Sequence, residues 1–172
     1  MNLPKPTKPG PQQGAATKWM RLLAVILVAL SACGAPARAR EDVRVVDGDG
    51  LRIADVRIRL WGIDAPELDQ RCGTHNNIPC GEDARFLLEA LTKGGDVVCE
   101  TRDRDPYGRV VAQCFAGGYD LAGEMVRQGY ALDWPRYSSG HYQDQQAEAR
   151  EAGRGMWAGP FTPPWDWRSQ RR

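Results

Sequence analysis

Residues 56–67 read Val-Arg-Ile-Arg-Leu-Trp-Gly-Ile-Asp-Ala-Pro-Glu, and the first half of this run alternates with the two-residue period of a β-strand. The aliphatic side chains share one face, which we expect to be buried, and the arginines share the other. Pro66 stiffens the exit from the strand, where the carboxylates of Asp64 and Glu67 follow. The stretch therefore predicts a half-buried strand that carries arginines and ends at a pair of acidic side chains.

Further elements are expected on both sides of this strand. We predict five short strands, at residues 43–46, 51–53, 56–61, 96–101 and 109–115. We predict three helices, at residues 82–93, 121–128 and 143–152, each followed by a glycine. This order predicts an α+β protein, and five strands with a helix between the third and fourth match the five-stranded OB-fold β-barrel. We expect one such domain over residues 40–158, between a leader at 1–39 and a Pro/Trp-rich tail at 159–172.

The charge of the chain is unevenly distributed. Five of the 23 basic residues and none of the 22 acidic residues lie in residues 1–39, so residues 40–172 carry 18 basic and 22 acidic residues and a net charge of −4. This balance argues against a protein that coats nucleic acid non-specifically, because such coating needs a basic field. It is compatible with a nuclease whose carboxylates hold a cation.

The first 39 residues predict export. Residues 1–17 are proline-rich and are expected to be disordered, and a start at Met20 would leave a compact signal sequence. The nine apolar residues 22–30 would form a helix of about 14 Å, too short to span a bilayer but suited to a secretory signal. Leu30–Cys33 resembles a lipobox, with lipidation at Cys33, whereas residues 35–39 offer sites for ordinary signal peptidase. Either route would place the protein in the periplasm, in the medium or on the outer surface.

Export determines how the remaining cysteines are interpreted. In an oxidising compartment four cysteines predict two disulfides. Cys99 and Cys114 would lie opposite each other on a hairpin, and Cys72 and Cys80 bracket one loop, so we predict these two pairs. A zinc site made of Cys72, His75 and Cys80 is the alternative, but it lacks a fourth ligand of its own.

Two pairs of acidic residues are candidates for a metal site. Asp47 and Asp49 flank Gly48 on a turn, so their side chains can converge, and Asp64 and Glu67 follow the arginine strand. Hard cations such as calcium prefer carboxylate and carbonyl oxygens. The Asp-Gly-Asp-Gly turn alone would be an ordinary hairpin loop.

Two arginines strengthen the prediction of phosphate chemistry. Arg59 lies on the strand just before Asp64, and Arg109 ends the sequence Asp-Pro-Tyr-Gly-Arg at residues 105–109. A phosphodiester gains negative charge as water attacks it, and guanidinium groups with a cation stabilise that charge. Carboxylates and arginines together supply the parts of a metal-assisted hydrolysis.

Three blocks of sequence carry a family resemblance. Residues 46–49, 58–67 and 105–109, in this order and spacing, resemble the thermonuclease family, whose type member is staphylococcal nuclease. The resemblance extends from about residue 42 to residue 157. It implies an OB-fold barrel with three helices and a calcium-dependent endonuclease that cuts DNA and RNA and leaves 3′-phosphate ends. We expect a monomer that needs no protein partner.

The resemblance also implies the roles of individual residues at the metal. Asp49 and Asp64 would bind calcium through their carboxylates, with the backbone carbonyl of Ala65 as a third ligand. Asp47 would lie just behind these ligands. Glu67 would act as the general base or orient the attacking water.

Other residues of the resemblance would face the substrate. Arg59 and Arg109 would bind the phosphate and stabilise its transition state, and Tyr107 would contact the phosphate or the adjacent nucleoside. Aromatic residues that would cover a base have no clean counterpart here. Trp134 and Tyr137 are the candidates, together with Tyr142.

The chain departs from the family pattern at two further positions. Gly50 stands where the family usually has threonine, so the metal loop lacks a hydroxyl, and Pro106 stands where the type member has a lysine. The alternative to an enzyme is a non-catalytic OB-fold module that binds nucleic acid. Such a module would not need Glu67, Arg59 and Arg109 together.

Overall fold

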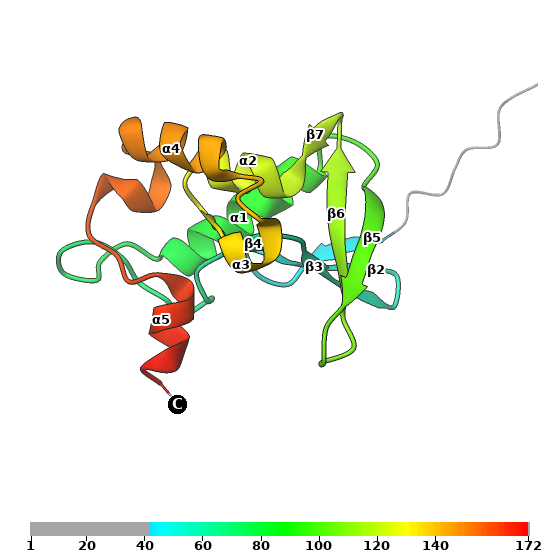
Figure 1. Ribbon diagram of the computed structural model, residues 1–172, viewed down its shortest axis with the longest axis horizontal. Helices are drawn as coiled ribbons and strands as arrows, with labels where there is room; N and C mark the ends of the chain where they lie inside the picture. Colours follow the sequence, from blue (N-terminus) through cyan, green and yellow to red (C-terminus); the bar gives the residue numbers. More distant parts are fainter. Residues whose placement is uncertain (1–41, 172) are drawn as a thin grey trace, which may run out of the picture. The chain divides into compact units, whose positions relative to one another are not determined.

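The architecture comes from a computed structural model, which describes residues 42–171 (Figure 1). The predicted export signal, the alternative start at Met20 and the lipidation site at Cys33 lie outside the described residues. Residues 40–172 form one compact unit. None of the helices between residues 42 and 171 is both long and apolar enough to cross a bilayer.

A mixed sheet forms the first half of the fold and carries the arginine strand at its centre. Its strands run in the order β1-β2-β3-β6-β5, and β7 pairs with β6. The strands are β1 (Val43–Val45), β2 (Gly50–Ile53), β3 (Val56–Leu60), β5 (Val98–Arg104), β6 (Val110–Ala116) and β7 (Tyr119–Asp120). Only the β3–β6 pair is parallel. A separate two-stranded sheet pairs β4 (Ile63–Asp64) with β8 (Leu132–Asp133).

The alternation of the arginine strand places its side chains largely as predicted. Ile58 and Leu60 are buried in the main core, and Arg59 lies on the opposite face of β3. Val56 is 48% exposed, because it begins the strand directly after the tight turn at Ala54 and Asp55. The core face of β3 therefore begins at Ile58.

Helices cover the core and extend to the C-terminus. They are α1 (Cys80–Thr92), α2 (Leu121–Arg127), α3 (Pro135–Ser138), α4 (Gln143–Glu151), the 3-10 helix η1 (Gly155–Ala158) and α5 (Pro164–Ser169). Helix α2 packs against α1 and α4, in the upper layer of Figure 1. Asp120 caps α2 by accepting hydrogen bonds from the backbone of Ala122 and Gly123, and it also accepts one from the Tyr142 hydroxyl.

The α+β class is confirmed, but the predicted barrel is confirmed only as a sheet. Within residues 42–171 no strand pairing joins β5 to β1, so the sheet is not clearly closed. The described residues also form five α-helices where three were predicted. The two additional helices, α3 and α5, begin at prolines, which suit the first turn of a helix as well as a loop.

A second hydrophobic cluster joins the C-terminal segment to the body of the fold. Its buried members are Cys72, Cys80, Leu132 and Met156, with partly buried Ile78, Trp157, Phe161 and Trp165 around them. Both predicted disulfides are present: Cys72–Cys80 lies inside this cluster, and Cys99–Cys114 links residues that face each other on β5 and β6. The segment that follows η1 is thus packed against a crosslinked loop.

Candidate functional site

Arg59 lies at the centre of the site, where it joins two carboxylates. Its Nη1 donates to Asp49 Oδ1, and its Nη2 donates to Asp64 Oδ1 at 2.9 Å and to the Ile63 carbonyl at 3.1 Å. Both carboxylates are almost fully buried. Asp49 and Asp64, fifteen positions apart in the sequence, are therefore held by one guanidinium group, as forked pairing with arginine allows.

The turn between β1 and β2 sets the position of Asp49. Asp47 Oδ1 accepts a hydrogen bond from the Asp49 backbone at 3.2 Å, and Asp49 Oδ2 accepts one from the Ala65 backbone at 3.0 Å. A Cβ atom on Gly50 would lie 2.6 Å from Asp47 Oδ1, so the glycine makes room for this carboxylate. Burial, together with the neighbouring Asp49 charge, raises the pKa of Asp47 to about 6.

Strand β4 places Asp64 in the interior. Asp64 pairs with Leu132 of β8, and its side chain is fully buried. Burial raises the pKa of the Asp64 carboxyl above its ordinary value, and hydrogen bonds from Arg168 oppose this effect. Arg168 Nη1 donates to Asp64 Oδ1 at 3.1 Å and Nη2 donates to Asp64 Oδ2 at 2.8 Å. Asp64 is thus paired with two arginines, Arg59 from β3 and Arg168 from α5.

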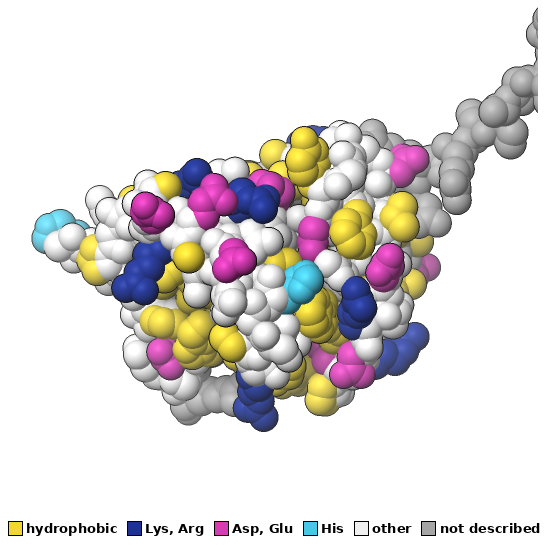
Figure 2. All heavy atoms as spheres, turned by 45° about the horizontal axis from the view of Figure 1, so that its top comes forward, with side chains coloured by type: hydrophobic (Ala, Val, Ile, Leu, Met, Phe, Trp, Pro, Cys, Tyr) yellow, Lys and Arg dark blue, Asp and Glu magenta, His cyan; other side chains and the backbone are white. Residues whose placement is uncertain are grey.

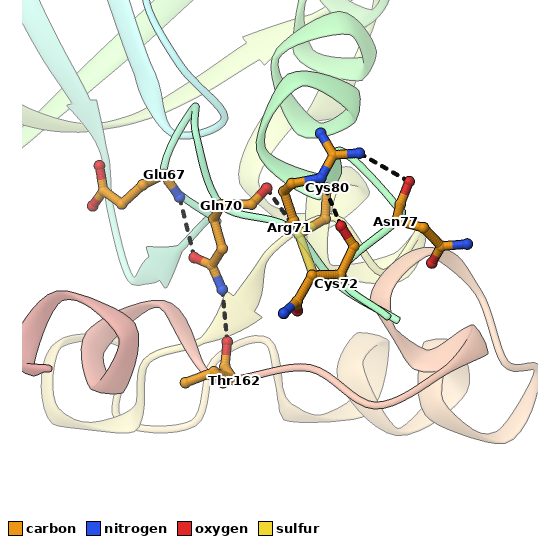
Figure 3. Close-up of a disulfide and its surroundings, with 8 residues drawn as sticks. Glu67, Gln70, Arg71, Cys72, Asn77, Cys80 and Thr162 are labelled. Atoms are coloured by element: carbon orange, nitrogen blue, oxygen red, sulfur yellow. Dashed lines mark hydrogen bonds between the residues drawn. A yellow bond between two sulfur atoms is a disulfide. The ribbon is translucent and has the colours of Figure 1, made fainter. Parts of the chain in front are cut away.

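The loop after Pro66 holds the backbone of Glu67 in place (Figure 3). The buried Gln70 accepts a hydrogen bond from the Glu67 backbone at 3.3 Å and donates one to the Thr162 carbonyl at 2.7 Å. A Cβ atom on Gly81 would lie 1.8 Å from the Glu67 carbonyl oxygen, so only glycine permits helix α1 to start this close to the loop. The Glu67 side chain is partly exposed, and Arg168 Nη1 donates to its Oε1 at 2.8 Å.

The β5–β6 hairpin delivers Arg109 from the other side. Arg109 Nε donates to Asp105 Oδ2 at 2.6 Å, and the Arg109 and Tyr107 backbones donate to Asp105 Oδ1 at 2.9 and 3.0 Å. Gly108 has a φ of +78°, which closes this loop in a conformation that glycine favours. The Arg109 guanidinium lies 5.9 Å from the centre of the Tyr107 ring.

These groups share one cavity of about 720 Å³. Its walls contain nearly all the side chains predicted for the site: Asp47, Asp49, Arg59, Glu67, Tyr107, Arg109, Trp134 and Tyr137, with the backbone of Ala65 beside them. Asp64 does not reach the wall, because Arg59 and Arg168 bond to it from the cavity side. In Figure 1 the tip of the β5–β6 hairpin and α5 project to the same side of the molecule, where both line this cavity.

Aromatic side chains form one end of the cavity. Trp134 and Tyr137 contact each other edge to face, with ring centres 4.6 Å apart, and Trp165 of α5 stacks on Trp134 at 6.1 Å. Tyr142, a third candidate for base contact, is buried and bonds to Asp120, so it cannot meet a substrate. Trp134 and Tyr137 are the two predicted aromatics that remain accessible.

The donor atoms of the site suit a hard cation. Asp49 and Asp64 bring carboxylate oxygens to one guanidinium group, and the Ala65 N–H donates to Asp49 Oδ2, which keeps the Ala65 backbone beside these oxygens. No three acidic, histidine or cysteine side chains are grouped as a closed metal site in the part of the chain that the structure describes. The predicted zinc alternative is also excluded, because Cys72 and Cys80 form a disulfide.

Arg168 bonds to both Asp64 and Glu67, yet the sequence interpretation did not include it in the site. It lies on α5, in residues predicted as a Pro/Trp-rich tail, yet its side chain lines the cavity. Residues close to Arg168 in the sequence could have indicated its place in the site. Pro164 can begin a helix, and Trp165 and Arg168, three positions apart, would then share one helix face.

Comparisons with known proteins show the family to which the chain is similar. A family model described as "Staphylococcal nuclease homologue" matches residues 57–159. A protein of Escherichia coli named "Uncharacterized endonuclease" is 36% identical over 137 residues, which cover 75% of this chain and 84% of that protein. A protein of Haemophilus influenzae with the same name is 30% identical over 158 residues, covering 87% of this chain and 84% of that protein.

A third relative carries a different name. "Succinoglycan biosynthesis protein ExoI" of Rhizobium meliloti is 32% identical over 150 residues, covering 83% of this chain and 77% of that protein. The residues that match the family model include Arg59, Asp64, Glu67 and Arg109. Arg168 lies beyond the end of the matched residues.

Proposed function

Because the chain belongs to the family of staphylococcal nuclease homologues, we propose that it is an exported, calcium-dependent endonuclease that hydrolyses phosphodiester bonds of DNA and RNA and leaves 3′-phosphate ends. One observation carries the proposal. A single guanidinium group, that of Arg59, joins Asp49 to the buried Asp64, and Arg59 lines one cavity together with Glu67 and Arg109.

Each side chain of this arrangement has a role in phosphodiester hydrolysis. Glu67, partly exposed at the cavity wall, accepts the proton of the attacking water. Arg59 and Arg109 approach the cavity from β3 and from the hairpin loop, so they can bind the phosphate from two sides. Both groups can donate forked hydrogen bonds to the charge that develops on the phosphate oxygens.

The metal would be held by the carboxylates of Asp49 and Asp64 and the carbonyl of Ala65. Bound calcium polarises the phosphate and offsets its charge. With a metal at these oxygens, the Arg59 guanidinium would be free to donate to the substrate phosphate in place of the two carboxylates. Asp47 maintains the turn that carries Asp49.

The proposed substrate is a nucleic-acid strand with accessible bases. Tyr137 is exposed at the cavity wall and offers a ring on which a base can stack without regard to sequence, and Trp134, which stacks on Trp165, packs against it. Basic and acidic side chains are interspersed on the face shown in Figure 2, and they form no continuous basic patch there. At the cavity itself, binding is expected to depend on the metal and on the lining arginines Arg59 and Arg109.

Export is supported by the two disulfides, which persist in oxidising compartments. Cell fractionation of the full-length chain tests it, and a Cys33→Ser variant separates the two processing routes. Membrane association that the variant loses indicates lipidation at Cys33, whereas unchanged release indicates ordinary cleavage. Retention of the intact chain in the cytoplasm contradicts export.

Incubation of the purified protein with labelled single-stranded DNA and RNA tests the activity. We expect cleavage of both in calcium, none in chelator, and fragments whose 3′ ends accept a ligated adaptor only after phosphatase treatment. Bound but uncut nucleic acid in calcium would support the non-catalytic OB-fold module instead.

A further inference from the structure

Arg168 joins the proposed base to the buried carboxylate of the centre. Its Nη1 donates to Glu67 Oε1 at 2.8 Å and to Asp64 Oδ1 at 3.1 Å, while Nη2 donates to Asp64 Oδ2 at 2.8 Å. One guanidinium group therefore fixes where the Glu67 carboxylate lies relative to Asp64. Glu67 has no other side-chain hydrogen bond among those found in residues 42–171.

The segment that carries Arg168 is fastened to the loop that carries Glu67. Gln70 bonds to the Glu67 backbone at 3.3 Å and to the Thr162 carbonyl at 2.7 Å, as Figure 3 shows. The backbone of Gly73 donates to the Pro160 carbonyl at 2.8 Å. These bonds place the start of α5 at a defined position beside the site.

Aromatic packing sets the orientation of α5. Trp165 stacks on Trp134 with ring planes 24° apart, and it also packs against the cluster around the Cys72–Cys80 disulfide. The Arg168 guanidinium lies 5.8 Å from the centre of the Trp134 ring, one helical turn after Trp165. Arg168 is thus held by packing as well as by its carboxylate partners, so it can restrain Glu67.

We propose that Arg168 is a positioning residue for the Glu67 carboxylate, supplied by a C-terminal helix beyond the residues that match the family model. The inference rests on the proposed function, because Glu67 needs a defined position only if it acts on a water. A flexible glutamate side chain occupies several rotamers, and a fixed one spends more time in the productive geometry. Arg168 acts through Glu67 and not on the phosphate.

A double-mutant cycle tests this assignment. Arg168→Gln and Arg168→Lys are each made in the wild-type and Glu67→Gln backgrounds, and cleavage is followed under single-turnover conditions with saturating calcium. We expect Arg168→Gln to lower the cleavage rate by ~10–100-fold in the wild type, the usual range for a residue that orients a group of the site. In the Glu67→Gln background the further loss should be under about 3-fold, because coupled residues are not additive.

Three accompanying measurements separate positioning from other roles. The KM for DNA should change little, and Arg168→Lys should restore part of the rate, since a lysine keeps the charge but not the fork. Calorimetry on the substrate-free protein should find calcium binding no weaker in Arg168→Gln than in the wild type. Arg171→Gln is the matched control, because Arg171, near the same helix, pairs with the exposed Asp69 and the Trp167 ring and does not line the cavity.

The outcomes are distinguishable. Equal losses in both backgrounds would show that Arg168 acts directly on the substrate and overturn the proposal. If Arg168→Gln cuts faster and needs less calcium, α5 inhibits the enzyme and the proposal is wrong. If weaker calcium binding accounts for the whole loss of cleavage rate, Arg168 is part of the metal site and the proposal is also wrong. If Arg168→Gln does not fold, the same cycle with Arg168→Lys decides. If the wild type cuts nothing, the proposed function fails. If the wild type cuts and the Arg168 variants cut at the same rate, this inference alone fails.

Discussion

Asp105 binds Arg109 through both of its carboxylate oxygens. Oδ2 accepts a hydrogen bond from Arg109 Nε at 2.6 Å, and Oδ1 accepts one from the Arg109 backbone at 2.9 Å. Partial burial would raise the pKa of Asp105, but these hydrogen bonds outweigh it and hold the pKa below its ordinary value. These bonds close the hairpin loop and hold the Arg109 side chain, which lines the cavity.

Asp105→Asn should lower the turnover of DNA by ~10–100-fold, because Arg109 is no longer held in one orientation and small displacements of a phosphate-binding group are costly. Steady-state kinetics in calcium measure this. Glu100→Gln on the same hairpin is the control, since the Glu100 side chain is 64% exposed and forms a loose ion pair with Arg102 at 3.6 Å. Equal activity of the two variants would show that Asp105 does not position Arg109.

The same pair predicts a dependence of stability on pH. The pKa of Asp105 is lower in the folded protein than its ordinary value of 3.8, so the ionised carboxylate stabilises the fold at higher pH. This contribution is lost as the pH falls through the folded pKa. Thermal melts from about pH 6 down to about pH 2 should therefore show a steeper loss for the wild type than for Asp105→Asn. Parallel curves would contradict the assignment.

Arg59→Lys should reduce activity by at least ~10²-fold, as expected when a forked donor to a developing oxyanion is lost. One guanidinium group serves Asp49, Asp64 and the Ile63 carbonyl, and an ammonium group cannot reproduce this geometry. Arg52→Lys on the neighbouring strand, whose side chain is exposed, is the control. Near wild-type cleavage by Arg59→Lys would show that Arg59 contributes only its positive charge and that the forked geometry is not required.

Gly81→Ala should destabilise the protein, although within a helix alanine is more favourable than glycine by about 1 kcal/mol. The added Cβ would lie 1.8 Å from the Glu67 carbonyl oxygen, so the loop that carries Glu67 must move, and activity should fall with stability. Gly123→Ala is the matched control. Its Cβ would meet Tyr142 at an ordinary 3.5 Å within helix α2. Denaturant unfolding of both variants measures the difference, and equal stabilisation would contradict the close contact.

The two disulfides should differ in their effect on activity. Chain entropy predicts about 2.5 kcal/mol of stabilisation from Cys72–Cys80 and about 3 kcal/mol from Cys99–Cys114, whose sequence separations are 8 and 15. Serine pairs at 72 and 80 should also lower the rate below the melting transition, because that loop supports the C-terminal segment. Serine pairs at 99 and 114 should affect mainly the melting temperature. The opposite ranking would show that the loop does not support the site.

Much of this molecule could be predicted because its informative residues are close in sequence. The strand that carries Arg59 runs directly into Asp64 and Glu67, and turn and hairpin signals place Asp49 and Arg109. Both disulfides followed from the same local elements. Those contacts depend on spacing within a few short segments, which a sequence displays directly.

The C-terminal part of the site could not be predicted in the same way. Arg168 and Asp64 are 104 positions apart, and their contact depends on how Trp165 stacks on Trp134 and how Gln70 bonds to Thr162. Such packing between distant segments has no periodic signature. The prolines before α5 also indicate a loop as readily as a helix start, so the sequence pattern alone could not distinguish the two.

Single-turnover cleavage of single-stranded DNA by the wild type and by Glu67→Gln, each in calcium and in chelator, tests most directly whether this arrangement is a metal-assisted nuclease centre. We predict that the wild type cuts only in calcium. Glu67→Gln should be at least ~10²-fold slower in calcium while it melts at the same temperature and binds calcium equally well. Cleavage by the wild type in chelator, or an unchanged rate in Glu67→Gln, would contradict the account.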